Sequence, residues 1–93
     1  MKAKIFALLL HSVTLTWVPP NCPCSVSVYR SEGGAAYVRR AANIETNTWT
    51  DRVPKSGKQE CYTLTATLLK DYNGFTKGTE SKPTPPSCVE VPQ

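Results

Sequence analysis

The chemistry that this 93-residue sequence predicts most directly is disulfide formation by its four cysteines. Cys61 lies in a segment where apolar and polar residues alternate, and Cys88 lies in the last apolar segment. Asn73-Gly74, between them, is a strong short-range signal for a hairpin turn. A hairpin folded about this turn places Cys61 opposite Cys88, and opposed residues of antiparallel strands can form a disulfide. The bond would close a loop of about 28 residues, worth roughly 3–4 kcal/mol in the chain-entropy model.

The other two cysteines, Cys22 and Cys24, are separated only by Pro23. They can bond to each other in a tight ring, bond to another chain, or stay reduced, because such close spacing strains the ideal disulfide geometry. The sequence leaves these three possibilities open. Zinc is not expected, since Cys-x-Cys followed by gaps of 36 and 26 residues does not resemble paired C-x2-C knuckles.

The remaining polar residues do not form a catalytic or metal-binding motif. His11 is the only histidine, so a catalytic triad or a histidine-based metal site would depend on it alone. None of the seven acids forms the closely spaced pair that a calcium loop needs. There is no phosphate-binding loop, dinucleotide fingerprint or nucleophile elbow. The sequence therefore predicts no catalytic residue, no metal and no cofactor, and the protein is not expected to be an enzyme.

The charge and hydropathy of the chain disfavour two further classes of partner. The formal net charge is +4, and the basic residues are scattered, with Arg39-Arg40 as a single adjacent pair. A mild basic excess of this kind is more typical of solubility than of nucleic-acid binding. The apolar run Ile5 to Leu10 is far too short to span a bilayer. Neither nucleic acid nor a membrane span is therefore expected.

Short segments with a period of two follow one another along the chain, which is typical of half-buried strands. They are Ser12–Trp17, Ser25–Arg30, Ala36–Arg40, Thr48–Thr50, Gly57–Thr67 and a last segment that follows three prolines, Pro83, Pro85 and Pro86. Because proline cannot donate to a β-ladder, the last strand should lie at a sheet edge or begin after Pro86. Strands at spacings of about 8–12 residues predict a single all-β sandwich or barrel.

In this order the segments resemble a fibronectin type III domain, over about Ser12 to Pro92. The motifs are Val13-x-Leu15-x-Trp17, Val28-Tyr29-Arg30, Gly33-Gly34-x-x-Tyr37, Thr48-Trp49-Thr50-Asp51, Gly57-x-x-x-x-Tyr62-x-Leu64-Thr65-Ala66 and Glu80-Ser81. They are similar to the bacterial form, which is often secreted or associated with the cell wall. The resemblance implies an immunoglobulin-like β-sandwich with an atypical first strand, in which residues 12–93 form the domain and residues 1–11 an apolar N-terminal segment.

The resemblance has a gap at the strand that contains Cys61. Members of the family carry a corner tyrosine there, whose hydroxyl ties the preceding turn. That place is expected to correspond to Glu60 in this sequence. We therefore expect the Cys61–Cys88 disulfide to replace the missing tie.

The N-terminal segment also departs from the family, because Leu10-His11-Ser12 offers no turn residue and no room for the chain to reverse. The segment begins like a signal peptide, but its apolar run of six residues is shorter than the usual run of about 7–15. It could be a local first strand reached through a tight kink, a strand exchanged with a neighbouring subunit, or a misannotated start or signal remnant. Head-to-tail exchange would build a fibre. Its assembly residues would be Ile5, Phe6, Leu8, Leu9 and Leu10.

Tyr72, Asn73 and Phe75 are the candidate ligand-binding residues, because binding residues concentrate at loop tips and exposed aromatic rings can stack on a sugar or a protein. The function predicted is that of a non-enzymatic extracellular or cell-surface subunit, structural or adhesive, which assembles with copies of itself into fibres. The alternative is a monomeric module that binds carbohydrate or protein, or an accessory domain of a secreted enzyme.

Overall fold

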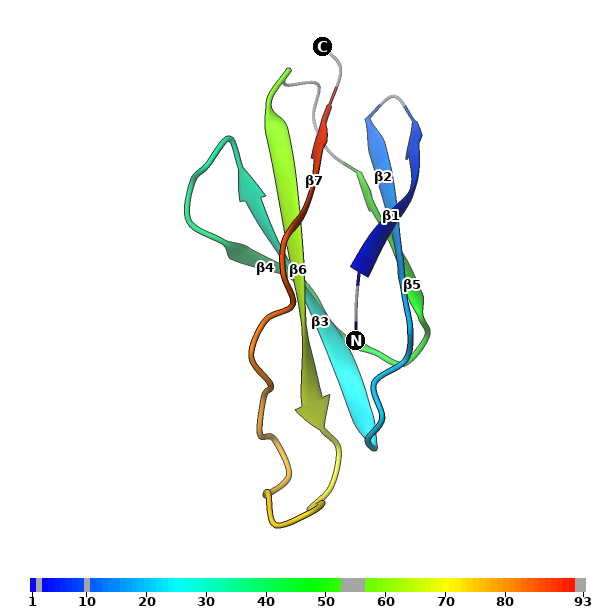
Figure 1. Ribbon diagram of the computed structural model, residues 1–93, viewed down its shortest axis with the longest axis vertical. Helices are drawn as coiled ribbons and strands as arrows, with labels where there is room; N and C mark the ends of the chain where they lie inside the picture. The colour runs from blue at the N-terminus through cyan, green and yellow to red at the C-terminus, as the bar shows by residue number, and fades with distance from the viewer. Residues whose placement is uncertain (2, 10, 53–56, 92–93) are drawn as a thin grey trace.

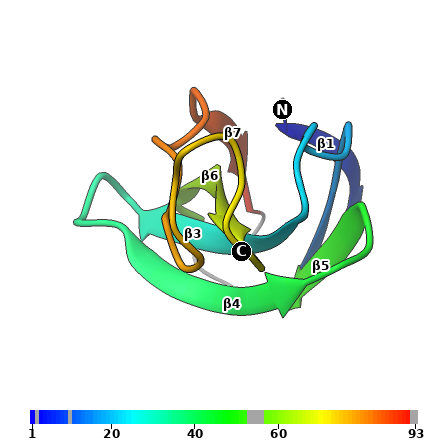
Figure 2. The same ribbon diagram turned by 90° about the horizontal axis from the view of Figure 1, so that it is seen from below.

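The computed structural model describes residues 1, 3–9, 11–52 and 57–91, with the backbone alone for residues 6–9. These residues form two antiparallel sheets that face one another (Figures 1 and 2). The first sheet has the order β1-β2-β5, and its strands are β1 (Ala3–Leu9), β2 (Ser12–Trp17) and β5 (Thr48–Arg52). The second has the order β4-β3-β6-β7, and its strands are β4 (Val38–Ile44), β3 (Cys24–Glu32), β6 (Gln59–Leu68) and β7 (Ser87–Glu90). The prediction of an all-β sandwich is confirmed.

The core consists of alternate residues of the central strands, as the period of two predicted. The buried apolar residues that form it are Ala3, Val13, Leu15, Trp17, Val26, Val28, Tyr62, Leu64 and Val91. Burial of one large apolar side chain stabilises a fold by about 1.5–3 kcal/mol. These side chains therefore hold the two sheets face to face.

The hairpin predicted between Cys61 and Cys88 is present in β6 and β7. Cys61 pairs directly with Cys88 in the antiparallel register, and their sulfurs are bonded. The turn at Asn73-Gly74 has φ angles of 49° and 84°, which suit a tight hairpin turn with two left-handed residues. β7 begins after Pro86 and lies at the edge of its sheet, so both expectations for the last strand are confirmed.

The expectation that the chain has no room to reverse near residue 11 is wrong. β1 pairs antiparallel with β2, with Leu9 opposite Ser12 and Ala3 opposite Trp17. His11 makes the reversal possible with a φ of 67°, a left-handed conformation in which histidine occurs more often than most non-glycine residues. Within this single chain the segment forms a local first strand, and its exchange between subunits stays a prediction. Among the predicted assembly residues, Leu10 and the side chains of Phe6, Leu8 and Leu9 lie outside the description.

A buried polar network joins the two sheets at one end of the core. Asp51 of β5 accepts hydrogen bonds from Arg30 of β3 at 2.6 Å and from the hydroxyl of Tyr62 of β6 at 2.8 Å. Glu60, which is 1% exposed, forms an ion pair with Arg30 at 3.1 Å between Oε1 and Nε. The hydroxyl of Tyr62 therefore links β6 to β5 through Asp51. The turn before β6 includes residues outside the description, so the expectation that the Cys61–Cys88 disulfide replaces a missing tie there stays a prediction.

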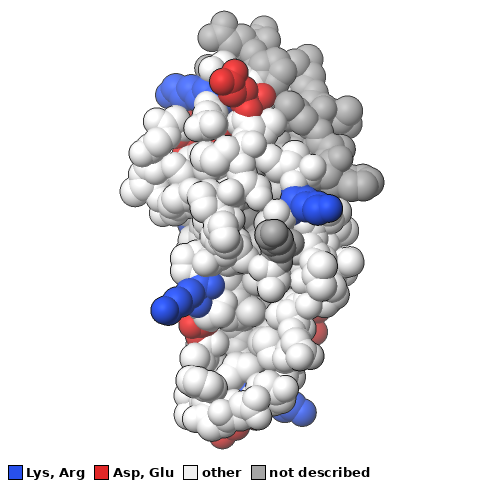
Figure 3. Space-filling view, in the orientation of Figure 1, with Lys and Arg blue, Asp and Glu red and all other residues white. Residues whose placement is uncertain are grey.

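Charges on the surface are spread out. Figure 3 shows the Lys and Arg side chains of one face as separate points, with no continuous basic patch. Among the described residues, the structure has no helix with the length and hydropathy that crossing a membrane requires.

The two disulfides should differ in their contribution to stability. In the chain-entropy model, the Cys61→Ala/Cys88→Ala variant should lose roughly 3–4 kcal/mol of unfolding free energy, because its loop is long. The Cys22→Ala/Cys24→Ala variant opens a ring of only three residues and should lose roughly 1–2 kcal/mol. Urea unfolding of both double variants measures this difference, and equal losses would contradict it.

Glu60 should make the stability depend on pH. Burial raises the pKa of its carboxyl above the ordinary value. A group whose pKa is raised by folding stabilises the fold below its unfolded pKa, and this contribution is lost as the pH rises through the folded pKa. The Glu60→Gln variant should therefore gain unfolding free energy relative to the wild type between about pH 4 and pH 7.

Urea unfolding at a series of pH values tests this expectation for Glu60. The exposed substitution Glu45→Gln controls for the change in net charge. If the difference in unfolding free energy between Glu60→Gln and the wild type stays constant over this pH range, Glu60 is not the source of the pH dependence.

Candidate binding surfaces

Residues 79–82 separate two hollows in the surface, and Glu80 and Ser81 line both of them. This segment runs beside β6 where β7 does not reach. Leu68 N donates to Thr79 O at 3.0 Å, and Ser81 N donates to Ala66 O at 2.8 Å. The hydroxyl of Ser81 also accepts a hydrogen bond from Ala66 N at 2.9 Å. These bonds fix the wall that the two hollows share.

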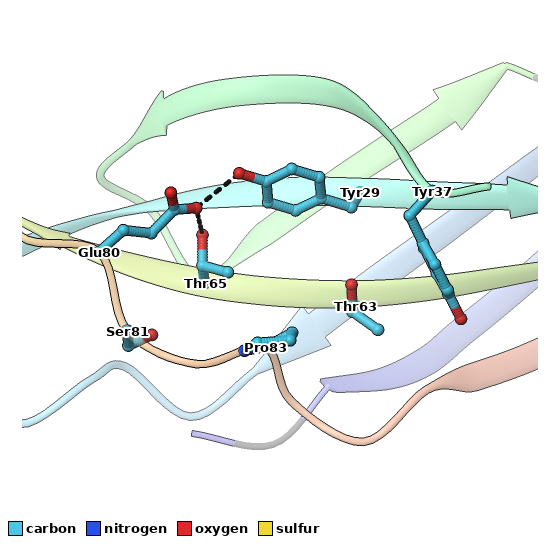
Figure 4. Close-up of a pocket in the computed structure, with 7 residues that line it drawn as sticks. All are labelled: Tyr29, Tyr37, Thr63, Thr65, Glu80, Ser81 and Pro83. Carbon is cyan, nitrogen blue, oxygen red and sulfur yellow. Dashed lines mark hydrogen bonds between the residues drawn. The ribbon is translucent and has the colours of Figure 1, made fainter.

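The first hollow, which we call the tyrosine cavity, has a volume of about 340 Å³ and lies on the outer face of the β4-β3-β6-β7 sheet (Figure 4). It is lined by Tyr29, Tyr37, Thr63, Thr65, Glu80, Ser81 and Pro83. Tyr29 of β3 and Thr63 of β6 point outward, because each alternates with inward core residues of its strand. The strands themselves therefore form the floor of this cavity.

Hydrogen bonds hold the Glu80 carboxylate at one end of the tyrosine cavity. The hydroxyl of Tyr29 donates to Glu80 Oε2 at 2.5 Å, and the hydroxyl of Thr65 donates to the same oxygen. The bonds from Thr65 and Tyr29 lower the pKa of the Glu80 carboxyl, because they favour its charged form. The bond to Glu80 also raises the pKa of Tyr29. The cavity therefore presents an ionised carboxylate and a neutral phenol at neutral pH.

The second hollow, which we call the pole cavity, has a volume of about 480 Å³ and lies at the Asn73 end of the sandwich. Its lining is mostly apolar and consists of Cys22, Cys24, Ala66, Leu68, Tyr72, Asn73, Phe75, Thr79, Glu80, Ser81 and Lys82. The structure thus brings together the predicted ligand-binding residues Tyr72, Asn73 and Phe75. Their role in binding stays a prediction.

The Tyr72–Phe75 turn presents two aromatic rings in a fixed arrangement. Tyr72 and Phe75 exchange two backbone hydrogen bonds, both at 2.9 Å. Lys77 N donates to the carboxylate of Asp71 at 2.8 Å, which ties the base of the loop. The rings of Tyr72 and Phe75 are 39% and 61% exposed. Two accessible aromatic side chains therefore stand on a well-ordered turn.

Cys22 and Cys24 are bonded to each other, so the structure selects the first of the three possibilities. Leu69 N donates to Pro23 O at 2.8 Å, which attaches the small disulfide loop to the end of β6. Because Cys24 pairs with Leu68 and Glu32 with Glu60, this loop lies at the end of β3 opposite to Cys61. The Cys22–Cys24 disulfide therefore forms one wall of the pole cavity.

The described part of the chain brings no three His, Cys, Asp or Glu side chains together as metal ligands. His11 lies at the reversal between β1 and β2, away from both hollows by its place in the sheet. The groups that the two hollows offer to a ligand include aromatic rings, hydroxyls and the carboxylate of Glu80.

The tyrosine cavity was not predicted from the sequence. The outward positions of Tyr29 and Thr65 follow from their alternation with Val28 and Leu64, which was a usable signal. The contact of Tyr29 with Glu80 spans 51 residues and lies outside any regular strand pairing. The Asn73-Gly74 turn was nevertheless a signal for the position of Glu80, because its register pairs Tyr72 with Phe75 and Thr67 with Glu80.

Comparisons with known proteins identify the fold. No protein-family model matches the sequence, and no curated protein matches it. The structure is similar to a Fn3-like protein from Clostridium thermocellum, with a TM-score of 0.69 and 24% identity over 90% of this chain and 80% of that chain. It is also similar to the twitchin kinase region from C. elegans (Fn31-NL-kin-CRD-Ig26), with a TM-score of 0.68 and 22% identity over 97% of this chain and 16% of that chain. The predicted fibronectin type III fold is confirmed.

The pKa of Glu80 should respond to the loss of its hydrogen-bond donors. The Tyr29→Phe variant keeps the ring and removes the hydroxyl that donates to Glu80, so the pKa of Glu80 should rise toward its ordinary value. Tyr37→Phe, which removes a hydroxyl from the opposite side of the cavity, is the matched control. A carbon-detected NMR titration of the Glu80 carboxyl measures the shift. An unchanged pKa in Tyr29→Phe would show that this bond does not form in solution.

Proposed function

We propose that this chain is a non-enzymatic recognition module of an oxidising, extracellular environment, and that the pole cavity binds an apolar side chain of a partner protein. The observation that carries the proposal is the Tyr72–Phe75 turn, which places two exposed aromatic rings beside an apolar cavity of about 480 Å³. The fibronectin type III fold supports this class of function by analogy.

The disulfides support the proposed environment. Both pairs, Cys22–Cys24 and Cys61–Cys88, are bonded, and the structure describes no free cysteine. Disulfides persist in secreted and surface proteins and are rare where cytosolic reductants keep thiols reduced.

The lining of the pole cavity favours a protein partner over a sugar at this site. Ala66, Leu68 and the Cys22–Cys24 disulfide supply apolar surface with few hydrogen-bonding groups. Aromatic side chains that fill or border such pockets carry a large share of binding energy in protein interfaces. Because the turn is already fixed by its own hydrogen bonds, binding costs little conformational entropy there.

Assembly by strand exchange is the second candidate, with Ile5, Phe6, Leu8, Leu9 and Leu10 as its assembly residues. The left-handed φ of His11 favours it, since a short, strained connection between strands invites exchange. Against it, β1 pairs with β2 of the same chain, Ile5 packs against the core, and Ser87 Oγ donates to Ala3 O at 2.9 Å. Exchange would have to break these contacts and form them again between subunits. Light scattering separates the two candidates, because the recognition module is monomeric.

Peptide selection tests the role of the pole cavity. The immobilised chain is used to select binders from a phage-displayed peptide library, and each selected peptide is then titrated against variants. We expect selected peptides with an aromatic or large aliphatic anchor. The Phe75→Ser variant should bind them at least about tenfold more weakly, because a hot-spot ring contributes roughly 2 kcal/mol or more.

The matched control for the Phe75 experiment is Val38→Ser, which removes an exposed apolar side chain from edge strand β4. Its affinity for the selected peptides should equal that of the wild type. Peptides that bind Phe75→Ser and the wild type equally, or that lose affinity with Val38→Ser, would place recognition elsewhere on the molecule.

A further inference from the structure

We propose that the tyrosine cavity is a second binding site, separate from the pole cavity, and that it takes a pyranose ring of a neutral glycan. The site is built from β3, the β3–β4 connection, β6 and residues 80–83. The proposal rests on the arrangement of its aromatic rings, its carboxylate and the charges around it.

The two tyrosines lie apart across the cavity. Figure 4 shows Glu80 at one end, with the Tyr29 hydroxyl directed toward it, and Tyr37 at the other end, with Thr63 between the two tyrosines. Tyr37 is 43% exposed, so its ring is accessible to a ligand. A pyranose ring has apolar C–H faces and a polar edge of hydroxyls. A tyrosine matches that surface, because it combines an apolar body with a polar tip.

The Glu80 carboxylate supplies the polar contact. The hydrogen bonds from Tyr29 and Thr65 both go to Oε2. A carboxylate has about four lone-pair sites on its two oxygens, so Oε1 keeps capacity to accept bonds from ligand hydroxyls. Such O–H···O⁻ bonds are roughly twice as strong as those between neutral groups. The donors from the protein also hold Glu80 in position before a ligand arrives.

The charges around the cavity select a neutral ligand. The negative charge of Glu80 repels an anion. The positive charge of Arg39 acts on both Glu80 and Tyr29, so it offsets the charge of Glu80 and makes the site less attractive to a cation. The volume of about 340 Å³ is at the low end of the range of about 300–1,000 Å³ for small-molecule sites. One or two sugar units match this size and polarity.

NMR titration of the full, isotope-labelled chain tests the proposal. The probes are methyl glycosides of glucose, galactose, mannose and N-acetylglucosamine, and the disaccharides cellobiose and lactose, each added separately. We expect at least one probe to cause saturable amide shifts at residues 29, 37, 63–65 and 80–83, with a dissociation constant on the order of 1 mM. Amides of the Tyr72–Phe75 turn should not shift.

Three variants locate the site. Tyr37→Ala removes an exposed ring and should weaken binding at least about tenfold, which corresponds to 1.4 kcal/mol. Glu80→Gln keeps an oxygen that accepts from Tyr29 and Thr65 but removes the charge, so the fold should be retained while binding weakens. Tyr72→Ala, at the pole cavity, should leave sugar binding unchanged. Thermal unfolding of each variant confirms that it is folded.

The proposal is overturned if none of these sugars causes saturable shifts at the tyrosine cavity, or if Tyr72→Ala abolishes binding while Tyr37→Ala does not. It is also overturned if tetramethylammonium chloride binds the cavity more tightly than every sugar, because that result identifies a cation site. All three outcomes leave peptide binding at Phe75 unaffected, so failure here is distinguishable from failure of the proposed function.

Discussion

The fold depends on one buried carboxylate, that of Asp51. It joins β5 of one sheet to Arg30 and Tyr62 of the other. Apolar burial holds two sheets together without direction, since the hydrophobic effect depends on area and not on orientation. A hydrogen-bonded ion pair is directional, and removal of one partner leaves an uncompensated buried charge at a cost of about 3–5 kcal/mol. Asp51 therefore fixes how the two sheets face one another, even where its net contribution to stability is small.

The two ends of the sandwich are constrained in different ways. At the Asp51 end, Glu60 adds a second buried charge to Arg30, and the adjacent Cys61–Cys88 bond locks β7 to β6. At the other end, the Cys22–Cys24 ring is small, so it restricts little of the unfolded chain and mainly shapes its own loop. Polar and covalent bonds thus stabilise one end, whereas the other end presents the Tyr72–Phe75 loop and the pole cavity. Binding residues concentrate on loops that a rigid scaffold positions.

Patterns with a short range in the sequence predicted most of the fold. The period of two placed Leu15 and Leu64 in the core, and the Asn73-Gly74 turn brought Cys61 and Cys88 onto neighbouring strands, where they pair. Interactions between residues that lie far apart in the sequence were not predicted. The reversal at His11 was missed because a left-handed histidine carries no turn signal. The burial of Glu60 depends on Arg30, and the tyrosine cavity depends on Glu80, and neither partner lies nearby in the sequence.

The prolines of the last connection explain why the ladder between β6 and β7 is short. Pro83, Pro85 and Pro86 have no N–H group, so residues 83–86 cannot continue the ladder that β7 forms with β6. Thr84, between them, still donates from its backbone N to Leu64 O at 2.9 Å, which keeps the segment against the sheet. The segment is therefore held in place without becoming a regular strand. Before this segment, Glu80 pairs with Thr67 in an isolated antiparallel bridge and so shares the outer face of the sheet with it, and Glu80 and Ser81 line both cavities.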